Sequence, residues 1–405
     1  MQPAELATLL ARQRSGWSLE QPFYVSPELY HLERRGWLAE QWYVLGHVSE
    51  LPAGGSYIVR ELLGESLLIV RDDKRALCGL YNVCRHRGSR LCDTDGRSRA
   101  LVCPYHGWSY HLDGSLRAAA ALPESIDRAQ LGLHRVPLRE IGGVILGSLT
   151  GDVRTLDIAE QTFAAGLSYH GIPQARIAAR RRYPTQANWK LVMENFIECY
   201  HCLPNHPEYC SVMRHVDAVA RDDAQSSAAW SRQVEQWFRE RADPQSPLGS
   251  SRYTAATGFC AAVRGPIGAD RQTQSQDGLP VAPLMGKLTR FDGGASSFRF
   301  EPFIFLGAMN DHAVLFQFLP AGPERTEVII TWLVNGSAAD ADVDIERMVW
   351  LWDRTTLEDK AIIERNAAGV RSRAYQPGPY TTLESWPARL LDRYRQEMRA
   401  RCTAA

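Results

Sequence analysis

The chain has 405 residues, of which 23% are charged, and 46 Lys and Arg residues balance 46 Asp and Glu residues. No excess of positive charge points to a nucleic-acid partner. No run of about 18 apolar residues occurs, so no membrane span is predicted. The first ten residues lack the pattern of a signal peptide, and we expect a cytoplasmic protein of two or three domains.

The cysteines are the next compositional clue, because their number is odd. In a long chain without a signal peptide this indicates reduced thiols, some of them metal ligands. The nine positions are Cys78, Cys84, Cys92, Cys103, Cys199, Cys202, Cys210, Cys260 and Cys402.

Residues 1–40 are predicted to form a lead-in segment that packs on the C-terminal domain. Within it Ser26, Pro27 and Gly36 mark the cap, the first position and the end of a short helix.

From Trp42 to Leu149 short β-rich runs alternate with Gly, Asp and Ser turns. A spacing of about ten residues is typical of a small antiparallel β domain, to which we assign residues 41–155. The predicted runs are Trp42–Val48, Ser56–Glu61, Ser66–Arg71, Ala76–Asn82, Ala100–Val102, Trp108–His111 and Gly143–Leu146.

Two Cys/His pairs lie in predicted loops at the ends of these runs. Cys84 and His86 are followed, after sixteen residues, by Cys103 and His106. Four such ligands suit a structural zinc ion or a [2Fe–2S] cluster in which two His replace two Cys on one iron. One residue between Cys84 and His86 is unusual for zinc and matches the Rieske pattern.

The segment Asn188–His206 carries an apolar stripe with polar residues on its flank, which predicts a helix packed into a core. Glu198 and His201 are three residues apart, so they should touch. Pro204 should break the helix and turn His206 back toward His201. Two imidazoles beside a buried carboxylate suit a divalent transition metal, although on this stretch alone ordinary helix-surface residues remain an alternative. The stripe consists of Trp189, Val192, Met193, Phe196, Ile197 and Tyr200.

Taken together, the two motifs resemble those of the α subunits of Rieske non-haem iron oxygenases, almost from end to end of the chain. The resemblance implies an α+β fold: a small antiparallel β Rieske [2Fe–2S] domain over 41–155, then a helix-grip catalytic domain over 156–405, in which helices pack on an antiparallel sheet. The cluster motif is met by Cys84, His86, Cys103 and His106, and the catalytic motif by Glu198, His201 and His206.

Beyond the first domain we expect a linker over about 151–187. Alternating residues predict strands over 297–301, 313–319 and 326–334. Residues 342–369 have helical periodicity, in one or two helices, with Gly369 suited to the C-terminal cap.

In the family a late helix of this kind supplies the third iron ligand, an aspartate. The resemblance assigns that role to Asp359, which shares a helix face with Ile362 and Ile363. Glu358 and Asp353 are the alternatives.

The resemblance also implies the cofactors: one Rieske [2Fe–2S] cluster and one Fe(II) per chain, with O2 as co-substrate. The chain has no flavin or nicotinamide fingerprint, so electrons should come from NAD(P)H through a separate flavin- or ferredoxin-type reductase. A homotrimer is implied, in which Glu198 bridges His106 of one subunit and His201 of the next.

Most members of the family carry Asp at this bridge, whereas this chain carries Glu198 within Glu-Cys-Tyr-His-Cys. That form resembles the branch that oxidises quaternary ammonium compounds: glycine betaine demethylase, stachydrine demethylase, carnitine oxygenase and choline monooxygenase. The implied reaction hydroxylates a carbon next to nitrogen and causes N-demethylation, with formaldehyde release, or C–N cleavage.

Two other functions are weighed against this one. The first is an aromatic-ring hydroxylating dioxygenase or aryl O-demethylase. The second is not an enzyme: a Rieske electron carrier or zinc-stabilised binding protein, which would have no mononuclear iron.

A quaternary ammonium substrate would favour an aromatic cage, for which Trp230, Trp237 and Phe318 are candidates. Asn195 resembles a polar residue that the family keeps near the iron. Cys199 and Cys202 form a Cys-x2-Cys pair, which we expect to serve packing rather than redox chemistry.

Overall fold

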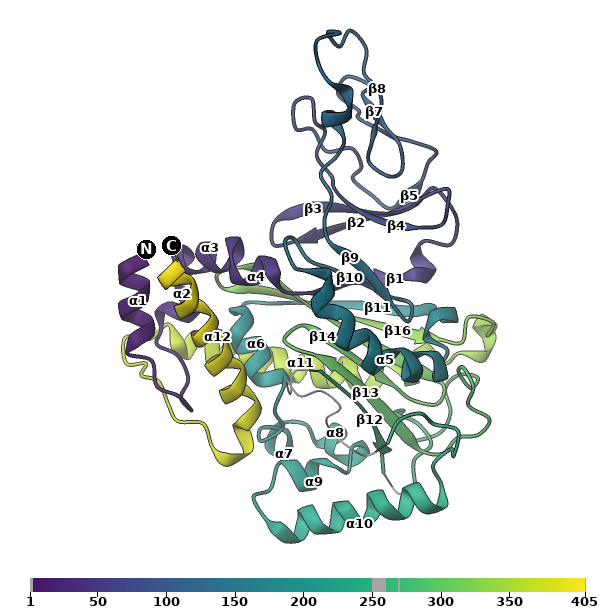
Figure 1. Cartoon of the computed structure of the whole chain (residues 1–405). Helices are drawn as coiled ribbons and strands as arrows, with labels where there is room; N and C mark the ends of the chain where they lie inside the picture. The colour runs from purple at the N-terminus through teal and green to yellow at the C-terminus, as the bar shows by residue number, and fades with distance from the viewer. Residues whose placement is uncertain (1–2, 250–259, 269, 405) are drawn as a thin grey trace.

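The computed structural model describes residues 3–249, 260–268 and 270–404, and it shows a large body with a narrower projecting lobe (Figure 1). Four helices open the chain at the body. The chain then forms the lobe and returns to complete the body. The opening helices are α1 (Pro3–Ala11), α2 (Pro22–Val25), α3 (Pro27–Arg35) and α4 (Trp37–Glu40).

The predicted N-terminal helix is confirmed as α3. The Ser26 hydroxyl accepts a hydrogen bond from the backbone N–H of Leu29, Pro27 occupies the first turn, and Gly36 caps the end. This segment packs onto the far end of the chain, because α1 lies along α12 (Ser385–Ala404).

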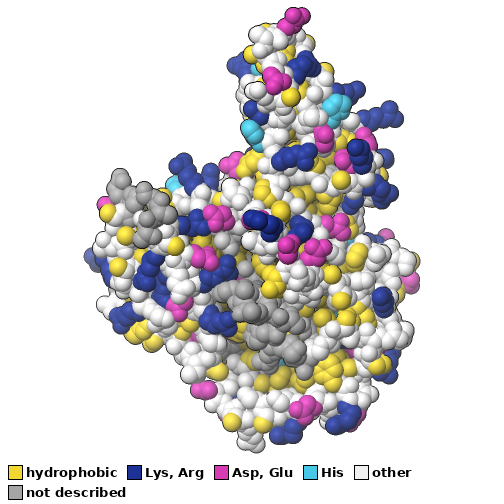
Figure 2. Space-filling model, viewed as in Figure 1, with side chains coloured by type: hydrophobic (Ala, Val, Ile, Leu, Met, Phe, Trp, Pro, Cys, Tyr) yellow, Lys and Arg dark blue, Asp and Glu magenta, His cyan; other side chains and the backbone are white. Residues whose placement is uncertain are grey.

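The lobe is built from short antiparallel strands, and a strand overlaps each of the predicted β runs. They form three small sheets in the orders β4-β3-β2-β5, β6-β7-β8 and β1-β10-β9. The strands are β1 (Tyr43–His47), β2 (Ser56–Leu62), β3 (Glu65–Arg71), β4 (Leu77–Tyr81), β5 (Gly96–Arg97), β6 (Leu101–Val102), β7 (Ser109–Tyr110), β8 (Leu116–Ala118), β9 (Leu138–Ile141) and β10 (Val144–Gly147). Figure 2 shows Lys, Arg and His side chains at the surface of this lobe.

The body is organised around one six-stranded antiparallel sheet in the order β11-β16-β15-β14-β13-β12. Its strands are β11 (Arg176–Thr185), β12 (Cys260–Pro266), β13 (Gly294–Phe300), β14 (Ile304–Ala308), β15 (His312–Gly322) and β16 (Arg325–Val334). The remaining helices are α5 (Asp157–Tyr169), α6 (Trp189–Phe196), α7 (Cys202–Asn205), α8 (Pro207–Val212), α9 (Val216–Val219), α10 (Ala224–Glu240) and α11 (Ile345–Val370). Antiparallel sheets covered by helices confirm the α+β fold class.

The predicted linker over 151–187 is wrong, because most of it is regular structure in α5 and β11. The basic run within it is an edge strand of the large sheet. Its arginines pair with carboxylates on neighbouring elements: Arg180 with Glu50, and Arg182 with Glu327. Charged side chains on an edge strand also discourage pairing with another chain.

The late helical segment is a single helix, α11, with Asp344 as its N-cap. Gly369 is not the cap, since it lies inside the last turn and Arg371 follows the final helical residue. No helix in the described part of the chain is long and apolar enough to cross a bilayer.

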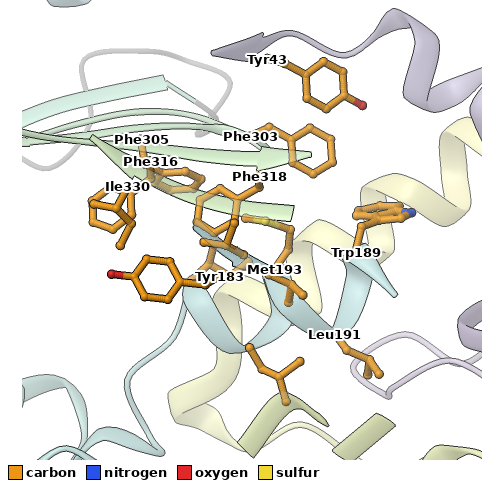
Figure 3. Packing of buried hydrophobic residues seen from close by; sticks show 14 of the residues in the cluster. Tyr43, Tyr183, Trp189, Leu191, Met193, Phe303, Phe305, Phe316, Phe318 and Ile330 are labelled. Carbon is orange, nitrogen blue, oxygen red and sulfur yellow. The ribbon is translucent and has the colours of Figure 1, made fainter. Parts of the chain in front are cut away.

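The main core lies between the sheet and α6. Figure 3 shows Phe316 and Phe318 on the sheet facing Met193 of α6, with Trp189 farther along that helix. Trp189 stacks on Trp37 of α4, with ring centroids 5.0 Å apart. Aromatic packing therefore fixes α6 between the sheet and the N-terminal helices.

A fully buried ion pair ties α6 to the N-terminal segment. The Lys190 ammonium lies 2.5 Å from a carboxylate oxygen of Glu33, and both side chains are inaccessible to solvent. Lys190 also donates to the backbone carbonyl of Phe23, at 2.9 Å. Burial removes water from the ammonium and lowers the pKa of Lys190, which the Glu33 charge partly offsets.

We predict that Lys190→Met destabilises the chain by about 3–5 kcal/mol, because it leaves Glu33 buried without its counter-charge. Lys287→Met is the control, since Lys287 is exposed and its loss should change stability by about 0.5 kcal/mol or less. Urea unfolding followed by tryptophan fluorescence measures both. Equal midpoints for the two variants would contradict the prediction.

Glu194, also on α6, makes the stability depend on pH. Burial raises the pKa of its carboxyl group from 4.5 to about 7, although the hydroxyls of Tyr380 and Tyr24 donate to it. The folded chain thus holds this proton more tightly than the unfolded chain, so stability should fall as pH rises from 4.5 to about 7. Glu194→Gln should reduce that slope in a series of melting temperatures across this range. Parallel curves for the two proteins would contradict the assignment.

Candidate metal sites

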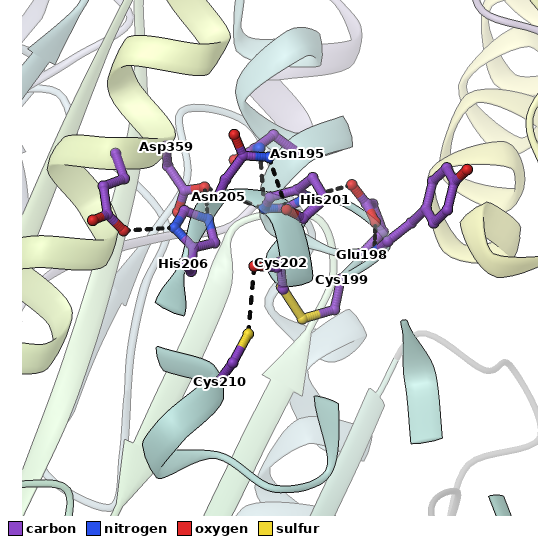
Figure 4. The surroundings of a disulfide bond; sticks show 11 residues. Asn195, Glu198, Cys199, His201, Cys202, Asn205, His206, Cys210 and Asp359 are labelled. Carbon is purple, nitrogen blue, oxygen red and sulfur yellow. Dashed lines mark hydrogen bonds and ion pairs between the residues drawn. A yellow bond between two sulfur atoms is a disulfide. The ribbon is translucent and has the colours of Figure 1, made fainter. Parts of the chain in front are cut away.

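Three side chains from distant segments meet in the body of the molecule. His201 precedes α7, His206 lies between α7 and α8, and Asp359 projects from α11 (Figure 4). Both imidazole Nε2 atoms face the same carboxylate oxygen of Asp359, at 3.2 Å from His201 and 2.9 Å from His206. Two imidazoles and one carboxylate are a ligand set that suits a non-haem Fe(II) centre with open positions.

Carboxylates behind the two rings hold them in this orientation. The Nδ1 of His201 pairs with Glu198, and the Nδ1 of His206 lies 2.8 Å from Glu358. A proton held on each Nδ1 leaves the Nε2 lone pair free to point at a metal. The expected contact between Glu198 and His201 is therefore present, and Glu358, considered above as a ligand, instead contacts the far side of His206.

The electrostatics of His201, His206 and Asp359 favour a cation between these three side chains. Burial alone would lower the pKa of His201, but hydrogen bonds to Asp359 and Glu198 raise it to about 9. Burial alone would raise the pKa of Asp359, yet the two imidazoles hold it below its usual value. A site that draws protons onto buried imidazoles would also attract a divalent metal ion.

The predicted long helix through Tyr200 is wrong, because α6 ends at Phe196 and a turn over 197–201 separates it from α7. Tyr200 is 48% exposed instead of lying on the apolar stripe. Pro204 does not break a helix here. The helix restarts at Cys202, so Pro204 falls in the first turn, where no N–H is required.

A small cavity adjoins the three ligands. Asp359 and Asn195 line it together with the aromatic rings of Phe196, Phe316, Phe318 and Trp352. The amide nitrogen of Asn195 lies 3.3 Å from Nε2 of His201, and its amide oxygen is buried without a hydrogen-bond partner. An unsatisfied acceptor beside the ligands suits a bound water or substrate group.

The three cage candidates have different surroundings. Phe318 lines the cavity. Trp237 is instead packed in the interior, where its indole N–H donates to the backbone carbonyl of Asp292 at 2.7 Å. Trp230 lies on α10 near His215. Asp353, the other alternative ligand, accepts a hydrogen bond from Tyr183 and pairs with Arg181.

The lobe holds the second candidate site in two similar loops. In one loop the backbone N–H of Gly88 donates to the carbonyl of Cys84, and in the other Gly107 donates to Cys103, both at 3.0 Å. Gly88 has φ +77° and Gly107 has φ +72°. This left-handed backbone is costly for residues with a Cβ, so glycine permits each tight turn after a Cys/His pair.

The four side chains divide into a buried pair and an exposed pair. Cys84 and Cys103 are 3% and 2% exposed, whereas His86 and His106 lie at the surface with ring centroids 4.6 Å apart. Burial raises the pKa of the Cys103 thiol, but hydrogen bonds from the backbone of Tyr105 and from Cys84 outweigh this and lower it. Donors around a sulfur favour the thiolate that an iron ion binds.

This division fits a two-iron cluster better than one zinc ion. A single ion would draw all four ligand atoms to one point. At His201, His206 and Asp359 the three ligand atoms all lie within 4.8 Å of one another. In the lobe the buried thiols and the exposed imidazoles form two separate pairs, which suits one iron held by the thiols and a second held by the imidazoles.

The expectation that the cysteines are all reduced is wrong at one place. Cys199 and Cys202 form a disulfide, while the other seven are free thiols. The end of α6 at Phe196 explains the difference, because the turn that follows brings the two Cα atoms to 4.9 Å, within the range that a disulfide requires.

Several cavity residues were not identified from the sequence. Trp352 and Thr356 line the cavity together with the predicted ligand Asp359 and its neighbour Ile363, and the four recur on one face of α11 at the spacing of a helix. That spacing was available in the sequence. Phe316 lies on β15. The sequence does not show that this strand faces α11, so its place in the cavity could not be predicted.

Comparison with known families identifies both parts of the chain. Residues 41–136 match the Rieske [2Fe-2S] domain, and residues 173–403 match the ring hydroxylating alpha subunit catalytic domain. The glycine betaine monooxygenase oxygenase subunit of Chromohalobacter salexigens is 36% identical over 405 residues, covering 98% of this chain and 89% of that protein. The carnitine monooxygenase oxygenase subunit of Escherichia coli is 34% identical over 206 residues, 49% of this chain and 54% of that protein.

Solved structures share the whole fold. A quaternary ammonium Rieske monooxygenase in complex with L-carnitine superposes with a TM-score of 0.70 at 22% identity, covering 97% of this chain and 98% of that chain. Naphthalene 1,2-dioxygenase from Rhodococcus sp. has a TM-score of 0.66 at 20% identity, with 98% of both chains covered.

We predict that Asp359→Ala abolishes high-affinity binding of a divalent metal in the body, because it removes a ligand. Glu358→Gln should weaken binding by about 10–100-fold, since it loosens the ring of His206. Asp353→Asn is the control on the same helix and should bind normally. Calorimetric titration of chelator-treated protein with Co²⁺ compares the three, and equal affinity in Asp359→Ala would rule out the ligand assignment.

Proposed function

The chain belongs to the Rieske non-haem iron oxygenases, and from this premise we propose that it hydroxylates a carbon next to nitrogen in a small quaternary ammonium compound. The observation that carries the proposal is the 36% identity to a glycine betaine monooxygenase oxygenase subunit across 98% of this chain. Hydroxylation of an N-methyl group gives a hemiaminal, which releases formaldehyde and the demethylated amine. Hydroxylation of a backbone carbon would instead lead to C–N cleavage.

Members of this family carry a Rieske [2Fe–2S] cluster and a non-haem iron. We assign the cluster to the lobe, with Cys84 and Cys103 on the inner iron and His86 and His106 on the outer iron. We assign the mononuclear iron to His201, His206 and Asp359. When bound, the cluster supplies single electrons and the iron activates dioxygen. We place the boundary between the two domains at residues 155 and 156.

Electron delivery is proposed to occur between subunits. The lobe that carries His86 and His106 projects away from the body that holds His201 (Figure 1), and both lobe histidines are exposed. Because the proposed electron donor is exposed and lies apart from the iron site of the same chain, electron transfer across a subunit interface is favoured. We propose a homotrimer in which Glu198, already paired with His201, contacts His106 of the neighbouring subunit.

The cavity supports a zwitterionic substrate. The faces of Phe196, Phe316 and Trp352 can receive a quaternary ammonium group through cation–π attraction. Lys360 lines the same cavity, and its ammonium pairs with Glu364 at 2.5 Å. We propose that Lys360 meets the carboxylate of a betaine, and that the unpartnered amide oxygen of Asn195 accepts a hydrogen bond from a water or substrate group near the metal.

The alternative is a ring-hydroxylating dioxygenase or an aryl O-demethylase. Aromatic walls would also receive a flat ring, and the naphthalene dioxygenase shares the fold. The glutamate at position 198 and the betaine-oxidising relative favour the quaternary ammonium substrate.

The electron source is proposed to be NAD(P)H, through a separate reductase in the cytoplasm. The sequence lacks a nucleotide-binding fingerprint of its own, so this chain alone should not turn over with NAD(P)H.

The substrate proposal is tested with purified, iron-loaded protein that has been chemically reduced and then exposed to O2. Glycine betaine, stachydrine, carnitine, choline and several aromatic acids are supplied separately, and products are measured by mass spectrometry. We expect formaldehyde with a betaine. In Lys360→Met, we expect the activity toward betaines to fall about tenfold relative to the activity toward choline. A betaine carboxylate would lose its charged partner, whereas choline has no carboxylate.

Trimethylamine from carnitine would place the oxidation on the backbone carbon. Product from an aromatic acid alone would overturn the quaternary ammonium proposal and support the dioxygenase alternative. An unchanged ratio of betaine to choline activity in Lys360→Met would overturn the assignment of Lys360.

We predict that Glu198→Gln retains both metal groups yet slows coupled turnover by about 100-fold, because the bridge to His201 loses its charge. Metal analysis and visible absorbance verify the occupancy, and oxidation of the pre-reduced cluster in stopped flow gives the rate. His86→Ala is the companion variant, expected to lose the cluster absorbance while keeping mononuclear iron. Wild-type turnover in Glu198→Gln would disprove the bridge.

A further inference from the structure

The disulfide between Cys199 and Cys202 encloses a proposed iron ligand. Its ring, which we call the disulfide loop (residues 199–202), contains His201, and Glu198 precedes it directly (Figure 4). Glu198 is proposed to deliver electrons and His201 to receive them. The disulfide thus constrains the backbone that joins these two residues.

The other contacts that hold this part of the chain are noncovalent: the His201 ring meets Glu198, Asp359 and Asn195, and the backbone N–H of Cys202 donates to the carbonyl of Cys199. The loop lies between the end of α6 at Phe196 and the start of α7 at Cys202. Glu198 accepts the backbone N–H of Tyr200, and the side chain of Asn205 donates to the carbonyl of His201 at 2.8 Å. The disulfide is the covalent restraint among these contacts, so its loss would widen the range of positions open to His201.

The two sulfurs differ in access. Cys199 is half-buried, whereas Cys202 is buried at 4% exposure. An incoming thiolate would therefore reach Cys199 first and release Cys202, the leaving group inside the protein. The seven other cysteines are free, including Cys210, whose thiol donates to the carbonyl of Cys202 at 3.4 Å. Oxidation is thus confined to the pair beside the metal site.

We infer that Cys199 and Cys202 form a reversible thiol–disulfide site that sets how firmly His201 and Glu198 are held. A dithiol reductant transfers two electrons: its thiolate attacks the Cys199 sulfur, Cys202 leaves and takes a proton, and the second thiolate then frees Cys199. The reductant becomes a disulfide and the protein gains two thiols. In the reverse direction, two thiols and one hydrogen peroxide give the disulfide and two waters.

The inference rests on His201 as a metal ligand and does not depend on the substrate. The disulfide form holds the ligand in place before the metal arrives, so it should bind metal more tightly and accept electrons from the cluster faster. Reduction should slow oxygenation while both metal groups stay intact. Peroxide formed nearby would restore the disulfide.

The first experiment counts thiols in the full-length protein. Trypsin is expected to release Leu191–Arg214, which contains Cys199, Cys202 and Cys210. Alkylation before digestion should add one label to this peptide in air-oxidised protein, three after dithiothreitol, and one again after hydrogen peroxide. Three labels from the start, or a number that dithiothreitol does not change, would overturn the reversible site.

The second experiment measures Co²⁺ affinity after the mononuclear site has been emptied by a chelator and the reductant removed by gel filtration. We expect the dithiol form to bind about tenfold more weakly. Oxidation of the pre-reduced cluster by O2 with substrate should slow by a similar factor in the loaded enzyme.

Variants distinguish the effect of Cys199 and Cys202 from that of the nearby Cys210. The double variant Cys199→Ser with Cys202→Ser should match the dithiol form and no longer respond to dithiothreitol. Cys210→Ser is the matched control and should respond as the wild type does. Equal affinity and equal cluster oxidation in both states of the wild type would overturn the link to the metal site. Absence of Co²⁺ binding in either state would instead refute the metal assignment, on which the inference rests.

Discussion

The structure depends on one buried meeting point, where two imidazole nitrogens face a single carboxylate oxygen of Asp359. Such a group is costly in a protein interior unless every charge is met. Glu198 and Glu358 meet the outer nitrogens of the two rings, so the inner nitrogens are left for a metal. The end of α6, the short helices α7 and α8, and the long helix α11 all serve to bring these groups together.

The helix before this point is anchored by a second set of buried polar groups. Lys190 and Glu33 form an ion pair without solvent access, and Glu194 receives hydroxyl donors from Tyr24 and Tyr380. These contacts join α6 to both ends of the chain. The N-terminal segment therefore helps to position the residues proposed as metal ligands, although it contributes none of them. The disulfide loop continues the same restraint past the end of the helix.

The lobe and the body divide the chemistry. The lobe exposes His86 and His106 while burying Cys84 and Cys103, an arrangement suited to presenting one side of a cluster to the outside. The body places the proposed metal site next to an aromatic cavity. A chain built in this way is suited to exchange electrons at a surface and to bind a small cation in an interior.

The sequence by itself determined the ligand types, since Cys84, His86, Cys103 and His106 and the Glu198–His206 spacing identify chemistry through local motifs. The family resemblance that these motifs carry also assigned the role of third ligand to Asp359. Tertiary structure alone decided what lies between segments: the partner of Glu358, the cavity shared by Phe316 and Trp352, and the turn that joins Cys199 to Cys202. Sequence periodicity indicates which face of an element is apolar. It does not indicate where a helix ends when side chains and a disulfide compete with its backbone hydrogen bonds. It also does not indicate which distant element the apolar face packs against.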